Sequence, residues 1–308
     1  MGPLPKVALI AGPTASGKSA LALALAEKHG GTIINADSAQ VYRDLRIVTA
    51  RPSLEEEARA PHRLFGHVDA ADTGYSAARW AAEARVEIDR AVAANSLPIL
   101  VGGTGLYLRT LIDGIAPVPE IDPAIRAEVR AMNLPDAYAA LTAVDRAEAA
   151  RLNPADTIRI GRALEVVRST GRPIADWRLE RVGGIGERID LTATILLPPR
   201  DWLNDRIDRR FAAMVDAGAI EEVAALIARE DVPLDGPIRR AIGMPELAAA
   251  ARGEITLDDA IDRASLATRQ YAKRQYTWFR NQPPVDWTRS EETDSFNQIS
   301  ELAIRLQH

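Results

Sequence analysis

A glycine-rich segment near the start of the chain carries the strongest chemical signal in the sequence. The pattern G-x-x-x-x-G-K-[ST] is matched at every fixed position by Gly12, Pro13, Thr14, Ala15, Ser16, Gly17, Lys18 and Ser19. Glycines allow a tight loop whose backbone N–H groups converge on an anion, and the lysine adds a mobile positive charge. The Ser19 hydroxyl suits Mg²⁺. The segment therefore predicts a site for a phosphate or a diphosphate, without saying which molecule carries it.

A carboxylate and a hydroxyl follow two other predicted strands. Asp37 ends the strand at 31–37, and Thr104 lies in the Gly-Gly-Thr-Gly sequence that follows the strand at 97–101. Because ligands of parallel sheets bind beyond the carboxyl ends of the strands, we expect the glycine-rich loop, Asp37 and Thr104 to meet in one crevice. Asp37 could there hold Mg²⁺ or accept a proton from a nucleophile. Helix capping by Asp37 and a turn role for Thr104 stay open as structural alternatives.

The strand at 97–101 lacks the acidic residue that P-loop NTPases use to hold Mg²⁺, since glycines and Thr104 follow it. This departure disfavours ordinary ATP chemistry. From the residues alone, a nucleotide or small-molecule kinase and a non-catalytic RNA-binding ATPase switch both remain open.

Alternating strands and helices must position these residues. The hydrophobic pattern predicts strands and helices in turn at 6–12, 19–28, 31–37, 77–94 and 97–101. This alternation is typical of a parallel α/β sheet. The rest of the chain is predicted to be helical from 123 to about 180, to form a last strand at 190–197, and to be helical again at 201–230, 245–252 and 256–281. We expect an α/β fold with a P-loop NTPase-like parallel sheet core (1–120 and 186–308) and a helical insertion domain at 121–185.

Composition limits the remaining classes. The chain has 308 residues, of which 47% are hydrophobic, so it can bury a large core. The absence of Cys excludes disulfides, thiolate metal sites and a Cys nucleophile. No apolar run approaches the length of a membrane span and no signal peptide is recognisable, so a cytoplasmic location is expected. The net charge is −5, yet the stretch 263–285 holds five basic residues and no acid. His62 and His67 lack metal-ligand spacing and are assigned no metal.

Seven segments together resemble the tRNA dimethylallyltransferases. They are GPTASGKS at 12–19, DSAQVY at 37–42, TARP at 49–52, PHRLF at 61–65, LVGGTGLY at 100–107, GRALEV at 161–166 and ATRQYAKRQYTWFR at 267–280. The resemblance runs over nearly the whole chain and is most specific in the DSA-x-x-Y and TRQ-x-AKRQ-x-TW-x-R elements. It implies transfer of a dimethylallyl group from dimethylallyl diphosphate to N6 of the adenosine 3′ of the anticodon, with release of diphosphate.

The same resemblance implies roles for the catalytic residues. The diphosphate would lie in the loop at 12–19 with Mg²⁺, Asp37 would take the proton of the N6 amine, and Thr104 would lie beside the leaving oxygen. The segment Leu203–Phe211 matches the family pattern L-x-x-RI-x-x-RF. It implies that Arg210 contacts the diphosphate, with Arg206 as a weaker candidate.

The resemblance also implies that the chain binds the anticodon stem-loop of tRNA, as a monomer, with the acceptor base flipped into a pocket. The helical insertion would clamp the stem-loop, and the basic and aromatic residues of the last helix would bind single-stranded RNA. The implied contacts are Asp37, Ser38, Ala39, Gln40, Thr104, Arg126, Ile158, Arg159, Ile160, Gly161, Arg162, Arg240, Gly243, Lys273, Arg274, Gln275, Trp278 and Arg280. Ile158 and Met244 depart from the Gln and Tyr usual in the family. A core role for Trp278 stays open as the alternative.

Overall fold

The computed structural model describes residues 2–307, with the exception of the side chains at 295, 296, 300 and 307. The chain divides into two compact units. Unit 1 comprises Met1–Leu111 and Ile185–His308, and unit 2 comprises Ile112–Gly184. The second unit thus begins earlier than the helical insertion expected at 121–185.

Unit 1 is built on a sheet of six parallel strands, in the order β3-β2-β4-β1-β5-β6. The strands are β1 Lys6–Ala11, β2 Gly31–Asn35, β3 His62–Arg63, β4 Leu97–Gly102, β5 Asp190–Leu196 and β6 Thr288–Ser290. The predicted parallel α/β core is therefore confirmed. The expectation that the strand at 190–197 would be the last one is wrong. β6 follows it, and its three residues, Thr-Arg-Ser, carry no apolar pattern that the sequence could have revealed.

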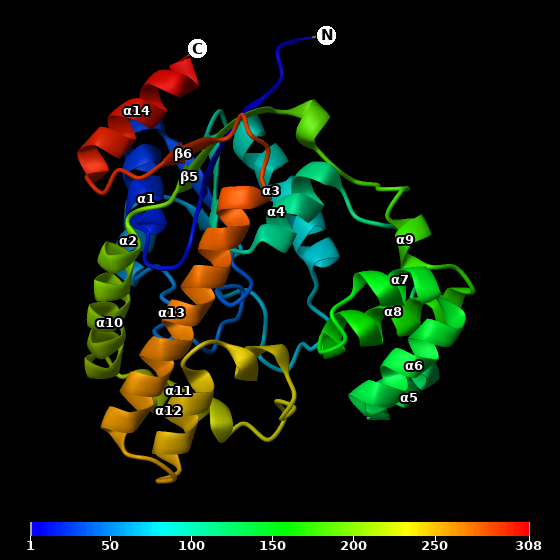
Figure 1. The fold of residues 1–308 in the computed structure, drawn as a ribbon. Coiled ribbons are helices and arrows are strands. Elements are labelled where there is room, and N and C mark those ends of the chain that lie inside the picture. Colours follow the sequence, from blue (N-terminus) through cyan, green and yellow to red (C-terminus); the bar gives the residue numbers. More distant parts are fainter. Residues whose placement is uncertain (1, 308) are drawn as a thin grey trace. The chain divides into compact units, whose positions relative to one another are not determined.

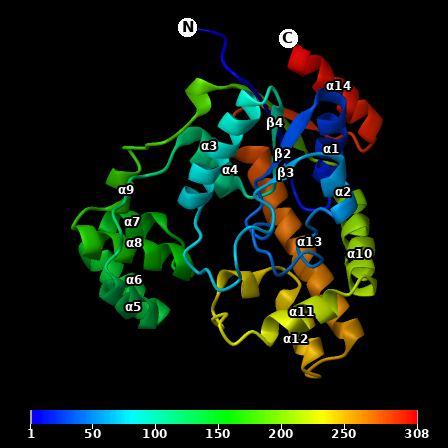
Figure 2. The ribbon, with the colours of Figure 1, turned by 180° about the vertical axis from the view of Figure 1, so that it is seen from behind.

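Helices cover both faces of this sheet (Figures 1 and 2). The helices α1 and α14 lie together on one face, and α3 covers the other. The helices with residues in unit 1 are α1 Lys18–His29, α2 Leu54–Arg59, α3 Ala77–Ala93, α4 Gly105–Asp113, α10 Arg200–Asp216, α11 Ala219–Ile227, α12 Met244–Ala251, α13 Leu257–Asn281 and α14 Ser295–Gln307. Among the described residues, no helix combines the length and the apolar character needed to cross a membrane.

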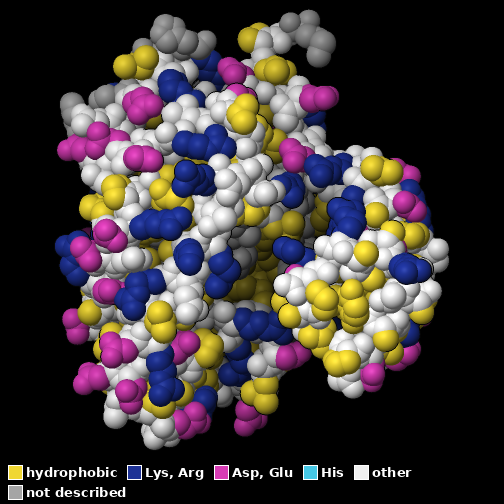
Figure 3. Space-filling model, viewed as in Figure 1, with side chains coloured by type: hydrophobic (Ala, Val, Ile, Leu, Met, Phe, Trp, Pro, Cys, Tyr) yellow, Lys and Arg dark blue, Asp and Glu magenta, His cyan; other side chains and the backbone are white. Residues whose placement is uncertain are grey.

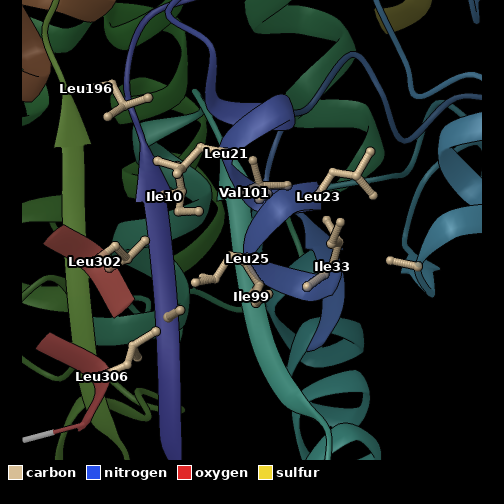
Figure 4. Close-up of a cluster of buried hydrophobic side chains, with 14 residues drawn as sticks. Ile10, Leu21, Leu23, Leu25, Ile33, Ile99, Val101, Leu196, Leu302 and Leu306 are labelled. Atoms are coloured by element: carbon tan, nitrogen blue, oxygen red, sulfur yellow. The ribbon is translucent and has the colours of Figure 1, made fainter. Parts of the chain in front are cut away.

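Apolar side chains from both layers fill the space between α1 and the sheet (Figure 4). Leu21 and Leu25 of α1 pack with Ile10 of β1 and Ile99 of β4, and Leu302 of α14 joins the same cluster. All five side chains are at most 1% exposed. Burying a large aliphatic side chain contributes roughly 1.5–3 kcal/mol, so this cluster fixes the start of α1 against the end of β1.

The opposite face of the sheet is closed by a buried tryptophan. The Trp80 side chain of α3 is fully buried, and its indole N–H donates to the carbonyl oxygen of Asn35 at 2.8 Å. The indole also stacks on Tyr107 of α4, with ring centroids 4.6 Å apart. Together these contacts hold α3 and α4 at the carboxyl end of β2.

Unit 2 is a small helical domain with its own core. Its helices are α5 Pro123–Ala131, α6 Leu134–Val144, α7 Arg146–Arg151, α8 Thr157–Thr170 and α9 Ile174–Trp177. Leu141, Ile160 and Leu164 are fully buried at its centre. Side chains of Asp122, Asn133, Asp145 and Asp156 accept backbone N–H groups at the starts of the four longer helices, the usual role of Asp and Asn at these positions.

The last residue of β4 is a tight point of the sheet and gives a first prediction. A Cβ at Gly102 would lie 2.2 Å from the backbone carbonyl of Ala36. We expect Gly102→Ala to lower the free energy of unfolding by about 1–3 kcal/mol, because the backbone must shift to relieve the overlap. Urea unfolding followed by circular dichroism measures this change.

Gly161→Ala is the matched control for this prediction. Gly161 lies inside α8, and the nearest atom to its added Cβ is 3.9 Å away. Because Ala is a better helix former, this change should raise the free energy of unfolding by up to about 1 kcal/mol. Destabilisation of similar size by both changes would contradict the steric argument.

Candidate active site

The predicted phosphate loop lies between β1 and α1 and is curled by two glycines. Gly12 has a φ of 148°, and a Cβ there would lie 2.5 Å from the carbonyl oxygen of Leu196. Gly17, with a φ of 95°, precedes the first residue of α1. The loop therefore turns back over the N-terminus of α1, where backbone N–H groups and the helix dipole favour an anion.

Three cations surround this loop. The ammonium of Lys18 donates to the carbonyl oxygen of Pro13 at 2.7 Å. From α10, Arg210 donates to the Thr14 hydroxyl at 2.6 Å, and Arg206 donates to the carbonyl oxygen of Ala15 at 3.0 Å. Two of the cations thus come from a helix almost two hundred residues away along the chain, and both contact the loop itself.

Burial of this positive charge lowers two pKa values. Desolvation lowers the pKa of Lys18 to about 8, against an opposing contribution from the Asp37 carboxylate. Desolvation and the neighbouring Arg206 lower the pKa of Arg210 to about 10. Each lowered pKa shows that burial makes the charged form of the side chain less favourable. An anion bound beside Lys18 and Arg210 would stabilise their charged forms again.

Asp37 is held rigidly at the end of β2. The buried amide of Asn35 bonds the Asp37 backbone twice, accepting its N–H at 2.8 Å and donating to its carbonyl at 3.0 Å. One carboxylate oxygen of Asp37 accepts the N–H of Ala39 at 2.9 Å. The Thr104 hydroxyl, which follows β4, accepts the N–H of Ser38 at 3.0 Å. The structure thus places Asp37 beside the phosphate loop and Thr104 against Ser38, while Thr104 itself lines neither of the two cavities described next.

Two cavities meet at Asp37. The phosphate-loop cavity, about 540 Å³, is lined by the loop residues 14–19 and by Arg206, Arg209 and Arg210. The inner cavity, about 380 Å³, is lined by apolar side chains and tyrosines. The two cavities share five of their lining residues: Thr14, Asp37, Thr49, Ala50 and Arg210. An anion in the first cavity can therefore lie next to a flat or apolar group in the second, with a carboxylate between them.

The inner cavity has a mixed wall. Val48, Ile207, Phe211, Met214 and Ile238 supply its apolar part. Its tyrosines are Tyr42, Tyr75, Tyr107 and Tyr271. Burial raises the pKa of the Tyr107 and Tyr271 phenols, and the nearby Asp37 carboxylate raises both further. These phenols therefore stay protonated at neutral pH and can donate hydrogen bonds within an otherwise water-poor space.

The turn at residues 46–50 contributes Thr49 and Ala50 to both cavities and is held by two side chains, Glu222 and Gln40. Glu222 of α11 accepts the backbone N–H groups of Arg46, Ile47 and Val48 at 2.5 to 3.0 Å. The side-chain amide of Gln40 donates to the carbonyl oxygens of Thr49 and Ala50 at 2.9 and 3.0 Å. The turn is thus fixed at both ends, by Glu222, which is distant from it in sequence, and by Gln40, which precedes it by about ten residues.

The residues expected to bind tRNA in unit 1 occupy different environments. Lys273, Arg274 and Arg280 are exposed on α13. Lys and Arg side chains are frequent on the side of unit 1 from which α13 is seen (Figure 3). Arg240 is exposed and lines the inner cavity. Gly243 is buried, with a φ of 88°, and a Cβ there would meet the Phe211 ring at 2.7 Å.

Two residues of α13 that were expected to contact tRNA pack against other parts of unit 1. Gln275 is only 6% exposed, and its amide bonds two loops of unit 1. Trp278 is half-buried against Gly105, where an added Cβ would approach its ring to 2.6 Å. The packing alternative considered for Trp278 therefore has direct structural support.

In unit 2 the expected tRNA residues fall into buried and exposed groups. Ile160 is fully buried in the core of the unit, so its side chain is not available for a contact with RNA. Ile158 is 79% exposed. Arg159 and Arg162 pair with Asp156 and Glu165 at 3.4 and 3.7 Å. Gly161 and Arg126 are half-buried on α8 and α5.

The described residues offer no metal site made of protein ligands alone. Within residues 2–307, no group of three or more His, Cys, Asp or Glu side chains is arranged to hold a metal ion. His67 instead contacts the Tyr75 hydroxyl at 3.0 Å and the Glu83 carboxylate at 2.9 Å. Ser19 is exposed and lines the phosphate-loop cavity, so its hydroxyl can reach a cation that arrives with a phosphate ligand.

Sequence reasoning missed several residues that shape this site. The sequence analysis did not single out Asn35, Tyr271 or Glu222. Asn35 holds the backbone of Asp37, Tyr271 lines the inner cavity, and Glu222 holds the turn at 46–50. A signal existed for Tyr271, which lies four residues before Gln275 and therefore on the same helix face. Glu222 gave no such signal, since its partners lie more than 170 residues earlier in the chain.

Comparisons with known proteins show which family the chain resembles. The family model for IPP transferase matches residues 40–282. A tRNA dimethylallyltransferase from Sphingopyxis alaskensis is 60% identical over 97% of this chain and 98% of its own length. The crystal structure of a tRNA isopentenylpyrophosphate transferase from Bacillus halodurans is 32% identical, with a TM-score of 0.69, and covers 98% of this chain and 97% of its own. A structure of a eukaryotic dimethylallyltransferase acting on tRNA is 30% identical, with a TM-score of 0.76, over 89% of this chain and 70% of its own.

The anchoring of the turn at 46–50 gives a second prediction. Glu222→Gln replaces one of the two accepting oxygens by an NH₂ group, which then faces two of the three backbone donors. We expect the free energy of unfolding to fall by about 1–3 kcal/mol, because at least one backbone N–H is left without an acceptor. Thermal unfolding of the purified protein measures this loss.

Glu221→Gln is the matched control, because Glu221 is the preceding residue of α11 and is exposed. This control should change the free energy of unfolding by less than about 0.5 kcal/mol. If the two variants were equally stable, Glu222 would not anchor the turn.

Proposed function

The chain belongs to the IPP transferase family, and we propose that its two joined cavities carry out the transfer of a dimethylallyl group from dimethylallyl diphosphate to tRNA. In this proposal the acceptor atom is N6 of the adenosine at tRNA position 37, next to the anticodon, and diphosphate is released. The observation that carries the proposal is the junction of a cationic cavity and an apolar cavity at Asp37.

The phosphate-loop cavity is suited to the leaving group. As the bond between C1 of the dimethylallyl group and its oxygen breaks, the bonding electrons pass to the diphosphate. The backbone N–H groups of residues 12–19, the Lys18 ammonium and the Arg210 guanidinium would stabilise this charge. Donors that are already in place where charge develops often supply the largest share of catalysis. A diphosphate leaving group also explains a phosphate loop without the acidic residue of ATPases.

The inner cavity is suited to the acceptor base. The adenine N6 amine is a poor nucleophile because its lone pair is delocalised into the ring. As the bond between N6 and C1 forms, N6 must lose a proton, and Asp37 lies at the junction where that proton appears. Asp37 is therefore proposed as the general base, a role typically worth about 10²–10⁴-fold in rate. Thr104 is proposed to act beside the leaving oxygen, and its hydroxyl also accepts the backbone N–H of Ser38, the residue after Asp37.

Mg²⁺ is the proposed cofactor, with the Ser19 hydroxyl as its protein ligand. Mg²⁺ keeps several waters and commonly takes its other ligands from substrate phosphates, so one protein oxygen in the phosphate-loop cavity fits its needs. When bound to the diphosphate, it would neutralise charge on the leaving oxygens.

Contacts with the anticodon stem-loop are proposed for both units. The exposed Lys273, Arg274 and Arg280 of α13 support binding to phosphates, as does Arg240 at the inner cavity. In unit 2 the exposed ends of Ile158, Arg159 and Arg162 remain proposed contacts. Binding through these cations would weaken as salt rises. A monomer in the cytoplasm would suffice, since one chain supplies both cavities.

A P-loop kinase, the alternative that the sequence left open, is not favoured. β4 ends in Gly102 and Gly103 with no acid to hold the metal of an ATP complex. The similar proteins are named as transferases that act on tRNA. The same two observations weigh against an RNA-binding ATPase switch.

The third prediction tests the proposed function directly. The protein is incubated with Mg²⁺, labelled dimethylallyl diphosphate and undermodified tRNA, and label in the tRNA is counted. We expect label in the tRNA with the unchanged protein, and about 10²–10⁴-fold slower labelling by Asp37→Asn, which keeps the oxygen that accepts the Ala39 N–H.

Asp205→Asn, on the exposed surface of α10, is the matched control and should label tRNA at the normal rate. ATP turnover without any labelling of RNA would overturn the proposal. Normal labelling by Asp37→Asn would remove Asp37 from the role of base.

The lowered pKa of Lys18 gives a fourth prediction. In the free protein, Lys18 loses its proton as the pH rises through about 8, so above that pH a bound diphosphate must also recruit a proton. We expect the Kd for dimethylallyl diphosphate, measured by calorimetry without tRNA, to rise by about tenfold between pH 7 and pH 9. Lys18→Met should bind more weakly at pH 7 and lack this pH dependence. A Kd of the unchanged protein that is constant over this range would contradict the assignment.

A further inference from the structure

Gln275 of α13 joins the two loops that carry the candidate catalytic groups. Its side-chain oxygen accepts the backbone N–H of Thr14 in the phosphate loop at 2.8 Å. Its amide nitrogen donates to the carbonyl oxygen of Gly103, in the loop after β4, at 2.9 Å. The side chain is only 6% exposed, so both hydrogen bonds are shielded from water. A single amide therefore bridges two loops that are some 90 residues apart in sequence.

The surroundings of this amide are shaped to receive it. A Cβ at Gly103 would lie 2.3 Å from the Gln275 amide nitrogen, so only glycine leaves room for the contact. On the other side, the hydroxyl of Thr14 accepts a hydrogen bond from Arg210 at 2.6 Å. Thr14 is thus held by Gln275 through its backbone and by Arg210 through its side chain, and it lines both cavities.

Tyr271 repeats the connection one helical turn earlier. Its phenol lies near the Thr104 hydroxyl and lines the inner cavity. Residues four apart lie on the same face of a helix, so Tyr271 and Gln275 form one buried edge of α13. This edge contacts the phosphate loop at Thr14 and the β4 loop at Gly103 and Thr104. The exposed Lys273 and Arg274 lie between them in sequence.

We propose that Gln275 is a positioning residue, whose amide fixes the phosphate loop and the β4 loop in register so that the leaving diphosphate lies at a set place relative to Asp37. The proposal rests on the transferase function proposed above, and it replaces the tRNA contact that the sequence suggested for Gln275. Parallel strands β1 and β4 bring the two loops to one edge of the sheet, but they do not fix the loop tips. The amide does, because its oxygen and nitrogen lie on one rigid plane.

The consequence belongs to the chemical step more than to substrate binding. Reacting atoms must be held close to their productive geometry, and a misplacement of about 1 Å can cost about 10²-fold in rate. Among the described residues, neither Lys18, Arg206 and Arg210 around the phosphate loop nor the exposed cations of α13 form a hydrogen bond with Gln275 itself. Removing the amide should therefore lower kcat while tRNA affinity is kept.

Two variants of Gln275 test this proposal. Gln275→Met keeps the shape of the side chain and removes both hydrogen bonds. We expect kcat to fall by about 10–10²-fold, with the KM for tRNA changed less than twofold. Gln275→Glu keeps an acceptor for the Thr14 N–H but loses the donor to Gly103 and adds a negative charge beside the anion site. We expect it to bind dimethylallyl diphosphate more weakly, and its kcat relative to the unchanged protein to recover as the pH falls and the introduced carboxyl gains a proton that it can donate.

Gln270 offers the matched control on the same helix. It is exposed, so Gln270→Met and Gln270→Glu should reproduce the kinetics and the pH profile of the unchanged protein. Labelling of tRNA by the unchanged protein tests the transferase function separately, so a failure there is distinguishable from a failure of the positioning role.

Three results would overturn the proposal. One is a higher KM for tRNA at unchanged kcat in Gln275→Met, which would restore the tRNA contact. The second is a lower melting temperature with normal kcat for the folded fraction, which would make the bridge merely structural. If Gln275→Met did not fold, Gln275→Glu would decide, and the absence of any recovery at low pH would be the third contradicting result.

Discussion

The arrangement of the site depends on one constraint, the parallel direction of the strands. When all strands run the same way, their carboxyl ends lie at one edge of the sheet, and every loop that follows a strand emerges there. Gly12 follows β1, Asp37 follows β2 and Thr104 follows β4, and these strands are neighbours in the order β2-β4-β1. An anion loop, a carboxylate and a hydroxyl therefore meet without any of them being close in sequence.

The electrostatics of this edge follow from its burial. Lys18 and Arg210 are half-buried, and the energetic cost of their charge appears as the lowered pKa of each group. Asp37 offsets part of that cost, but a single carboxylate does not balance the cations around the loop. A diphosphate would supply the missing negative charge. In the proposed function, this excess of positive charge would favour a highly charged anion at the site.

Helix α13 serves two surfaces at once. Its buried edge, with Tyr271 and Gln275, contacts the catalytic loops, and its exposed edge carries Lys273, Arg274 and Arg280. A helix is stiff over this length, so a group bound on the exposed edge and a group bound at the phosphate loop share one rigid reference. This arrangement gives a physical reason for placing the exposed cations, which are proposed to bind RNA, and the loop contacts on a single element.

The sequence alone determined the features that are local. The phosphate loop, the strands at β1, β2 and β4, the helical character of unit 2 and the family resemblance were all readable, because each depends on residue types at short, regular spacing. The positions of Asp37 and Thr104 at the carboxyl ends of their strands were also readable, since that rule needs only the strand positions. Only the tertiary structure decided which residues hold these groups in place. Glu222, Asn35 and Gln275 contact residues that are brought to them only by the fold, so the spacing of the sequence does not reveal these contacts. Gln275 follows two cations of its helix and was therefore expected to be exposed, but the fold buries it. The short polar strand β6 could not be predicted from the sequence, because its pairing with β5, and not its own composition, makes it a strand.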